Sequence, residues 1–408
     1  MMTKLEAILK YVSENNDFYK RRIKEYKITN PLDITQWPIL TRKELQENRY
    51  NMFSDGYRDK FFNQQLHRQS SSGSSGIPIN VYWDKTDWYA SNMSMWRRRL
   101  KYNKIHPHDK YVIFTLNASG IKNKNNISLF INSPSNVLIA NTSLIFERKD
   151  EPIWAKTISE FNPVWLYIQP FILNRLIETY IEYNIAVPTN LRYIESVGEI
   201  LSEDIRKKAM SLFNIPVTNF YGSEEFNGIA YETISHRLEI LDENVFVEVL
   251  NNDKICKNGH GEAIITSLNN HAVPLIRYNQ QDIVSVFQAE DDANGNAYIQ
   301  NIVGRSYNTV ELNHININSF MLTEIIGEIN NKLGDPIKEY KFAYCKRENI
   351  LYCNIVVNSQ FEKWEIAIKE HLSCLLECKI GKNNLIFKIK TVPLIYNNSK
   401  KHNIFEII

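Results

Sequence analysis

A run of small polar residues near position 70 constrains this chain more than any other feature of its sequence. Residues 70–76 read Ser-Ser-Ser-Gly-Ser-Ser-Gly and are followed by Ile77 and Pro78. Hydroxyls that alternate with glycines have little use in a packed core. They suit a loop around a polyphosphate, because glycine permits positive φ angles and backbone N–H groups bind anions without steric bulk. On this run alone, a plain linker is the more frequent interpretation.

The residues next to the run limit the kinds of site that it can form. It lacks the Gly-Lys-Ser/Thr ending of a P-loop and the Gly-x-Gly-x-x-Gly of a dinucleotide site, so kinase-type and hydride-transfer functions lose their main support. Residues 79–83 alternate as a strand does, and residues 88–100 have the apolar spacing of a helix. Ordered structure directly after the run argues against a free linker.

The length, net charge and hydropathy of the chain limit the classes of protein to which it can belong. A chain of 408 residues with 43% hydrophobic content can form two or three domains with a sizeable core. The net charge of +2 is too small to predict a nucleic-acid surface. Residues 1–16 are amphipathic without a continuous apolar segment, and no stretch approaches the roughly 18 apolar residues that span a bilayer. We therefore expect a cytoplasmic protein that is not inserted in a membrane.

The cysteines favour reduced thiols. There are five, an odd number without a Cys-x-x-Cys pair, which fits neither a disulfide framework nor a zinc site. Cys374 and Cys378 are four residues apart on a predicted helix, a spacing that can hold a metal. Packing as buried thiols is nevertheless the favoured interpretation.

The pattern of apolar residues predicts an α/β body followed by a smaller domain. The stretch to about residue 64 reads as helical, with a capping box at Thr41 and Glu44. From about residue 111 short apolar runs alternate with helical segments, and after about residue 232 short strands and turns predict a β-rich subdomain. Beyond residue 305 two helices and three strands suit a small α+β domain. The expected domains are residues 1–304 and 305–408.

Two later segments share the polar and glycine-rich character of the first. In Phe220-Tyr221-Gly222-Ser223-Glu224-Glu225 the tyrosine could stack on a base, and a carboxylate could hold Mg²⁺ on a triphosphate. In isolation an ordinary strand and turn with surface acids is the more frequent interpretation. Residues 274–278, Pro-Leu-Ile-Arg-Tyr, read as a strand, with Asp282 in the turn after it. Asp282 could accept both hydroxyls of a ribose or simply cap the turn.

Taken together, the segments resemble the adenylate-forming enzymes, in the branch of phenylacetate-CoA ligase and the capsule-biosynthesis proteins. Residues 71–78 resemble the family's Ser/Thr-Ser-Gly-Ser/Thr-Thr-Gly-x-Pro loop, residues 221–225 its Tyr-Gly-x-Thr/Ser-Glu motif, and residues 274–282 its Pro-Leu-Ile-Arg-Tyr…Asp element. Further matches are Gly198-Glu199, Gly259-x-Gly261, Gly304-Arg305 and residues 38–41. The resemblance spans nearly the whole chain and implies a large N-terminal adenylation domain with a small C-terminal domain that rotates.

The resemblance also implies a reaction and a set of site residues. ATP and a carboxylic acid would react to an acyl-adenylate and pyrophosphate, and a thiol or amine would then take the acyl group. The phosphate loop would be Ser71, Ser72, Gly73, Ser74, Ser75 and Gly76. The adenine would be lined by Gly198, Glu199, Phe220 and Tyr221, next to Gly222 and Ser223 of the same motif. Glu225 would bind Mg²⁺, Asp282 the ribose, Arg305 the nucleotide near the hinge, and Lys400 or Lys401 the carboxylate and α-phosphate.

Three departures from the family pattern bear on activity. Glu224 replaces the hydroxyl residue that the family places before the Mg²⁺-binding glutamate, which adds negative charge near phosphate. Asn308 stands in the hinge motif where the family has an acidic residue. The tail reads Asn398-Ser399-Lys400-Lys401, and Lys401 is the favoured catalytic lysine because Ser399 stands two residues before it.

The leading hypothesis is therefore an ATP- and Mg²⁺-dependent acid ligase, with coenzyme A, the phosphopantetheine of an acyl carrier protein, or an amine as acceptor. An aromatic acid is favoured by analogy, and a homodimer is left open as the assembly. Two alternatives stay open from the sequence: a degenerate homologue that binds nucleotide or a carrier protein without adenylation, and transfer of AMP to a cofactor hydroxyl.

Overall fold

A computed structural model describes most of the chain. The described residues are 2–70, 79–115, 129–132, 136–141, 151–288, 296–305, 309–312, 315–381, 385–393, 395 and 404–408, of which 129–132, 141, 288 and 305 are described by backbone alone. The chain divides into two compact units, each made of two segments. Unit 1 is Met1–Pro107 with Thr218–Ile302, and unit 2 is His108–Val217 with Val303–Ile408.

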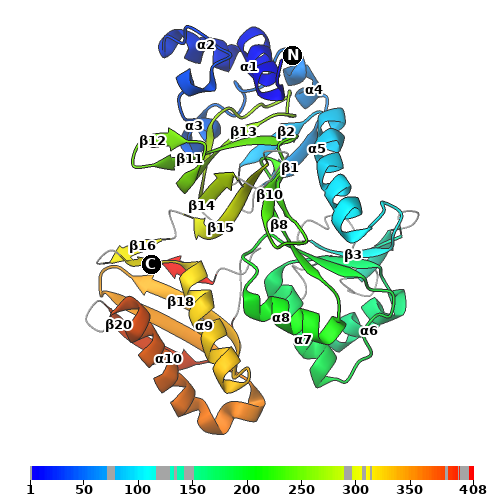
Figure 1. Cartoon of the computed structure of the whole chain (residues 1–408), viewed down its shortest axis with the longest axis vertical. Coiled ribbons are helices and arrows are strands. Elements are labelled where there is room, and N and C mark those ends of the chain that lie inside the picture. The colour runs from blue at the N-terminus through cyan, green and yellow to red at the C-terminus, as the bar shows by residue number, and fades with distance from the viewer. Residues whose placement is uncertain are drawn as a thin grey trace. The chain divides into compact units, whose positions relative to one another are not determined.

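Unit 1 begins with short helices, drawn in blue in Figure 1. They are α1 (Lys4–Asn15), α2 (Asp17–Glu25), the 3₁₀ turn η1 (Ile34–Gln36), α3 (Arg42–Glu47) and α4 (Tyr57–Phe62). Thr41 and Glu44 form the predicted capping box at the start of α3, with Thr41 Oγ1 accepting from Glu44 N and the Glu44 carboxylate accepting from Thr41 N. The helical interpretation of this stretch is confirmed.

Two strands and a long helix follow in unit 1. Strands β1 (His67–Ser70) and β2 (Asn80–Trp83) pair antiparallel, and α5 (Lys85–Arg98) continues into a π-helical turn, η2 (Arg99–Asn103). Asp84 caps α5 by accepting a hydrogen bond from Thr86 N. Strand β2 and helix α5 were predicted from periodicity after the Ser/Gly run, whereas β1 was not predicted.

The second segment of unit 1 is the predicted β-rich region. Its strands are β8 (Val217–Ser223), β9 (Asn227–Glu232), β10 (Leu238–Ile240), β11 (Val245–Asn251), β12 (Lys254–Cys256), β13 (Gly259–Ser267), β14 (Tyr278–Gln288) and β15 (Ala297–Arg305). They are ordered β12-β11-β13-β14-β15-β10-β9-β8. The N-terminal segment joins this sheet at Leu40, whose N–H donates to Arg277 O and whose carbonyl accepts from Asn279 N. One apolar core holds the helices and strands together, with Trp37, Leu40 and Tyr278 almost fully buried in it.

Unit 2 contains a parallel sheet and the C-terminal α+β region. The parallel strands are β3 (Tyr111–Thr115), β5 (Val137–Asn141), β6 (Trp165–Ile168) and β7 (Tyr193–Val197), in the order β7-β6-β3-β5, with β4 (Leu129–Asn132) antiparallel at the edge. Helices α6 (Glu151–Phe161), α7 (Pro170–Glu182) and α8 (Glu203–Phe213) share an apolar core with these strands. Buried parallel strands connected by helices give the α/β architecture that the sequence predicted.

The C-terminal region of unit 2 has its own sheet and core. Its elements are β16 (Val310–Leu312), β17 (Ile315–Ile317), α9 (Ser319–Leu333), β18 (Ile337–Cys345), β19 (Ile350–Val357), the 3₁₀ turn η6 (Ser359–Trp364), α10 (Glu365–Ile380), β20 (Ile386–Thr391) and β21 (Phe405–Ile407). The sheet order is β20-β19-β18-β21, and α9 and α10 pack against it (Figure 1). The domain boundary between residues 304 and 305 stays a prediction.

Two local expectations were wrong. Residues 274–277 are not a strand, because Arg277 has φ of +50° and β14 begins only at Tyr278. Cys374 and Cys378 are exposed on α10 rather than buried, since that helix buries Ile368, Leu372, Leu376 and Ile380 on the other side. The five cysteines form no disulfide. Across the described part of the chain, no helix combines the length and the apolar character needed to cross a membrane.

Candidate nucleotide site

The predicted site residues divide between the two units. Unit 1 carries Phe220 to Glu225 and Asp282, and unit 2 carries Gly198 and Glu199. Arg305 ends β15 and is described by its backbone alone. The phosphate-loop residues 71–76 and the tail lysines Lys400 and Lys401 lie outside the described residues, as does Asn308.

The two flanks of the Ser/Gly run are held in register. Ser70, the last residue of β1, is opposite Asn80, the first residue of β2. Next to Ser70, Gln69 donates from Nε2 to Asn227 Oδ1 at 2.6 Å, and Asn227 donates from Nδ2 to Ser91 Oγ at 2.6 Å. Asn227 begins β9, two residues after Glu225. The start of the run is therefore tied to the turn that carries the predicted Mg²⁺ ligand.

Tyr221 and Asp282 meet directly, although 61 residues separate them in the sequence. The Tyr221 hydroxyl donates to Asp282 Oδ2 at 2.6 Å, and both residues are buried, with 9% and 7% of their surface exposed. Gln280 Nε2 donates to the same carboxylate oxygen at 3.1 Å. Two residues that the resemblance assigns to one nucleotide thus share a hydrogen bond within unit 1.

Strand irregularities place these two side chains. Asn279 is opposite Ile264 and Ile283 is opposite Glu262, so residues 280–282 of β14 face a single residue of β13. Asp282 therefore lies in a bulge inside β14 rather than in a turn after a strand, as the sequence suggested. The β8–β9 register also shifts between Tyr221 and Gly222. Bulges of this kind re-aim side chains and are frequent beside active sites.

The turn between β8 and β9 carries Glu225. This residue is buried, with 6% of its surface exposed. Ser223, the last residue of β8 before this turn, has an enclosed Oγ without a hydrogen-bond partner in the described part of the chain. Buried polar atoms are nearly always paired, so the enclosed Ser223 hydroxyl without a partner, two residues before the buried Glu225, marks a place where a ligand can supply one.

Gly222 is required by the close approach of two backbone segments. A Cβ at this position would lie 2.2 Å from the carbonyl oxygen of Asn227 and 3.0 Å from Phe220 Cζ. The next residues leave the strand for the turn, in which Glu224 is half-buried. The glycine therefore sets the path of the chain into the turn that presents Glu224 and Glu225.

In unit 2, Gly198 and Glu199 follow β7. Gly198 has φ of +79°, a conformation that L-residues with a side chain rarely adopt. Glu199 Oε2 accepts from Phe171 N at 3.3 Å, in the first turn of α7. A carboxylate is favourable at a helix N-terminus because of the helix dipole, so Glu199 has a structural partner in addition to the adenine-lining role that the resemblance implies.

Arg277 of the Pro-Leu-Ile-Arg-Tyr motif is a structural residue in this fold. Its guanidinium donates from Nε and Nη2 to Glu248 at 2.9 and 2.6 Å and from Nη1 to the Trp37 carbonyl at 2.9 Å. Both charged side chains are 5% exposed. The bidentate pair links β11 to the segment before β14.

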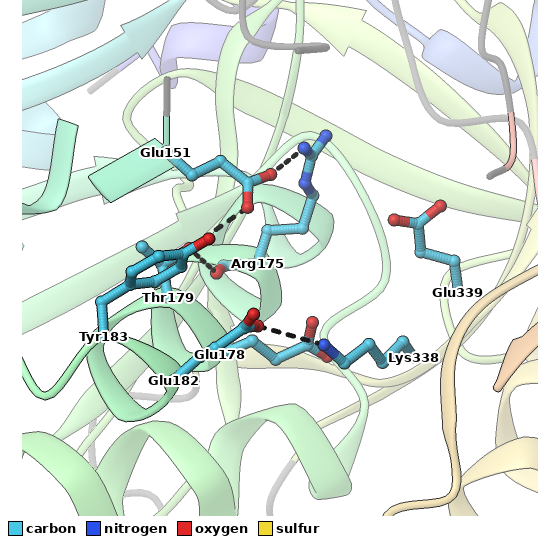
Figure 2. Close-up of a pocket in the computed structure, with 8 residues that line it drawn as sticks. All are labelled: Glu151, Arg175, Glu178, Thr179, Glu182, Tyr183, Lys338 and Glu339. Atoms are coloured by element: carbon cyan, nitrogen blue, oxygen red, sulfur yellow. Dashed lines mark hydrogen bonds and ion pairs between the residues drawn. The ribbon is translucent and has the colours of Figure 1, made fainter. Parts of the chain in front are cut away.

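A separate polar cavity lies in unit 2 and contains none of the predicted site residues. Figure 2 shows its lining residues on α6, α7 and β18: Glu151, Arg175, Glu178, Thr179, Glu182, Tyr183, Lys338 and Glu339. Arg175 pairs with Glu151, and Lys338 Nζ lies 3.3 Å from Glu182 Oε2. Its volume of about 30 Å³ is room for about one water molecule, which is too small for a nucleotide.

Sequence reasoning missed Gln280 and the Gln69–Asn227 contact. Gln280 stands two residues before Asp282 on the same strand, so its proximity could have been inferred once Asp282 was placed on a strand rather than in a turn. The Gln69–Asn227 contact joins segments 158 residues apart, and no local pattern reports such a pair.

Comparison with known proteins places the fold. No protein-family model matches the chain. Protein CapK of Staphylococcus aureus is 24% identical over 409 residues, which cover 95% of this chain and 80% of that protein. The crystal structure of 2-hydroxyisobutyryl-CoA ligase in the postadenylation state, in complex with 2-HIB-AMP, aligns with a TM-score of 0.77 at 16% identity over 98% of this chain and 87% of the ligase.

A third match is an amide bond synthetase rather than a CoA ligase. The amide bond synthetase McbA from Marinactinospora thermotolerans aligns with a TM-score of 0.53 at 13% identity, over 82% of this chain and 66% of that protein. These similarities confirm the fold class that the resemblance implied, that of the adenylate-forming enzymes with a small C-terminal α+β region.

Proposed function

We propose that this chain is a ligase that uses ATP to activate a carboxylic acid as an acyl-adenylate and then transfers the acyl group to coenzyme A or an amine. The observation that carries the proposal is the hydrogen bond between Tyr221 and Asp282. It joins the two motifs that the adenylate-forming enzymes use for adenine and ribose. The shared fold with a CoA ligase bound to an acyl-AMP, and with an amide bond synthetase, supports both half-reactions.

The first half-reaction needs the α-phosphorus held in line with the acid. One carboxylate oxygen of the acid attacks the α-phosphorus, and the bond to pyrophosphate breaks. Asp282 would hold the ribose hydroxyls, Tyr221 would lie against the adenine, and the Ser/Gly run would hold the departing phosphates. A tail lysine, Lys401 or Lys400, would neutralise charge that develops on the phosphoryl oxygens, and Arg305 would contact the nucleotide near the hinge.

The residues present fit a magnesium ion. Mg²⁺ is commonly held by one or two carboxylates together with substrate phosphates rather than by a cage of protein ligands. Glu225 supplies one buried carboxylate. No group of three metal-binding side chains occurs in the described part of the chain. Mg²⁺ bound there would neutralise charge on the triphosphate.

In the second half-reaction the acceptor attacks the acyl carbon and AMP leaves. The acceptor is proposed to be coenzyme A or an amine, with the phosphopantetheine of a carrier protein as a further thiol of the same chemistry. The acid would be a small molecule, with aromatic acids as the first class to examine.

The experiment is a measurement of pyrophosphate release from ATP and Mg²⁺, with hydroxylamine as a trap, across pools of aryl, aliphatic and amino acids. We expect release that depends on the acid and is lost in Asp282→Ala and Lys401→Ala. Glu14→Ala, an exposed change on α1, is the folded control and should keep wild-type rates. No release with any acid in a protein that binds ATP would contradict the proposal and favour a nucleotide-binding homologue, with Glu224 the first residue to revert to threonine.

A further inference from the structure

Asp282 is held by two donors on one oxygen. Its Oδ2 accepts from the Tyr221 hydroxyl at 2.6 Å and from Gln280 Nε2 at 3.1 Å. The carboxylate comes from a residue that is 7% exposed, so these hydrogen bonds replace water that the charge would otherwise lose. We call the pair Tyr221 and Gln280 the brace.

The brace fixes the rotation of the carboxylate. Rotation about the last side-chain bond of an aspartate is broad and nearly two-fold, so a carboxylate without constraint samples many orientations. Two donors from different strands, β8 and β14, on the same oxygen select one orientation. The direction of the other carboxylate oxygen follows from that choice.

The amide of Gln280 is committed to this contact. Gln280 is 9% exposed, and its Oε1 is enclosed without a hydrogen-bond partner among the described residues. Turning the amide over would place Oε1 against Asp282 Oδ2, and two acceptors repel each other. An unpaired buried acceptor lowers stability, yet the fold keeps it, because only this orientation directs Nε2 at the carboxylate.

The backbone is also arranged around the carboxylate. Gln280 and Asp282 lie in the bulge of β14 opposite β13, and Gln281 between them has φ of +65°. A side chain in the left-handed region is strained, and such strain gathers at functional sites. The bulge, the strained backbone and the unpaired amide oxygen all occur within residues 280–282. What they have in common is that each helps to set the orientation of the Asp282 carboxylate.

We propose that Tyr221 and Gln280 are positioning residues that hold Asp282 for the hydroxyls of a ribose, and that the brace makes the site selective for ribonucleotides. The proposal rests on the proposed adenylation and names the determinant of its nucleotide selectivity. A carboxylate can distinguish a sugar with hydroxyls from one without them only while it points at those hydroxyls. Loss of either donor therefore weakens binding of a ribonucleotide and leaves binding of a nucleotide without sugar hydroxyls unaffected.

The test compares variants of the two brace residues with two nucleotides, one with and one without ribose hydroxyls. Tyr221→Phe keeps the ring and removes only the donor, and Gln280→Met keeps the length of the side chain without a donor. For each, kcat/KM is measured with ATP and with 2′,3′-dideoxy-ATP. We expect either change to lower kcat/KM for ATP by about tenfold, mainly through KM, and to leave kcat/KM for the dideoxy nucleotide within about twofold, since one hydrogen bond to a charged group is at stake.

Two outcomes would overturn the brace. An equal loss with both nucleotides would mean that the changes act on the fold or on the adenine, and no loss with either would mean that Asp282 needs no positioning. Tyr221→Leu is the matched comparison: removal of the ring should weaken both nucleotides, and removal of the donor to Asp282 should weaken ATP further, so its ratio of ATP to dideoxy nucleotide should match that of Tyr221→Phe.

A direct measurement of nucleotide affinity tests the brace independently of the proposed adenylation. Calorimetric titration with ATP and with 2′,3′-dideoxy-ATP measures the affinity ratio without turnover. Absence of pyrophosphate release in the wild type would contradict the adenylation, while the affinity ratio would still report on the brace. If Tyr221→Phe fails to fold, Gln280→Met carries the test, and an unchanged affinity ratio in Gln280→Met would refute it.

Discussion

At residue 222 the backbone leaves no space for a side chain. The Cβ of an alanine would lie 2.2 Å from the Asn227 carbonyl oxygen, which belongs to the backbone and cannot rotate away. We expect Gly222→Ala to lower the free energy of unfolding by about 1–3 kcal/mol, the usual cost of overpacking. Urea denaturation followed by tryptophan fluorescence would measure it.

Gly327 provides the matched control for that change. It lies inside α9, and an added Cβ would meet only Asp204 Cβ at 3.7 Å, an ordinary contact. Gly327→Ala should leave stability unchanged or raise it by up to about 1 kcal/mol, because alanine favours a helix interior. Equal losses in the two variants would show that steric crowding is not what Gly222 avoids.

Single residues also show which local features could be predicted from the sequence alone. The capping box at Thr41 and Glu44 was predictable because its partners are three residues apart. The positive φ of Arg277 was not, because it depends on a pair with Glu248, 29 residues away. For Cys374 and Cys378 the information was present, since the buried side chains of α10 recur every four residues at positions offset from both cysteines.

At the scale of elements, the pair of Arg277 and Glu248 connects β11 to the segment that enters β14. Both side chains are 5% exposed, and the guanidinium also donates to the carbonyls of Trp37 and Thr35. Glu248→Ala would leave a buried, unpaired guanidinium, for which we expect a loss of about 3–5 kcal/mol in the free energy of unfolding. Urea denaturation of the variant measures it.

The control for that prediction is an exposed ion pair. Lys43 and Glu47 on α3 are 3.8 Å apart, with 82% and 59% of their side chains exposed. Glu47→Ala should change stability by less than about 0.5 kcal/mol. A loss below about 1 kcal/mol in Glu248→Ala would argue that water reaches the guanidinium and that the pair is not structural.

A histidine connects α5 to the loop before β14. His271 Nδ1 lies 3.1 Å from Asp87 Oδ2, and this hydrogen bond raises the pKa of His271 above its ordinary value of 6.5, against the opposing effect of burial. A raised folded-state pKa contributes stability below pH 6.5 that is lost as pH rises through the raised value. We expect the melting temperature of the wild type to exceed that of His271→Asn at pH 6 and the difference to shrink by pH 9.

Asp87→Asn tests the cause of that pH dependence. Because the carboxylate raises the histidine pKa, its removal should abolish the same part of the melting profile. A wild-type profile that is parallel to those of both variants from pH 6 to 9 would show that the contact does not titrate with folding.

At the scale of the whole molecule, the order of motifs carried more information than any single one. Strands, helices and the β-rich region were placed from periodicity, because apolar spacing reports local structure directly. The contact of Tyr221 with Asp282 joins residues 61 apart and follows from the bulges in β8–β9 and β14, which no local pattern records. The resemblance put both residues in one site, and the fold adds Gln280 to them.

Unit 2 contains charged contacts between helix α8 and the end of α9 that bear on domain movement. Lys208 Nζ lies 2.9 Å from Asp204 and 2.5 Å from Asp335, which follows α9. Burial raises the pKa of Asp204, and hydrogen bonds with the two carboxylates raise the pKa of Lys208 against its burial. A half-buried lysine between two acids stabilises the contact between these elements, together with the pair of Lys338 and Glu182 at the polar cavity.

If the C-terminal region rotates between half-reactions, as the resemblance implies, the ion pairs of Lys208 with Asp335 and of Lys338 with Glu182 must break in one of them. Lys208→Met removes the charge and keeps the length of the side chain, so it weakens one arrangement relative to the other. We expect the ratio of the pyrophosphate-release rate to the rate of acyl transfer from a preformed adenylate to change by about threefold or more. Lys207→Met, an exposed neighbour on the same helix, should leave this ratio as in the wild type. Equal ratios in all three proteins would mean that the contact stabilises unit 2 without regulating the reaction.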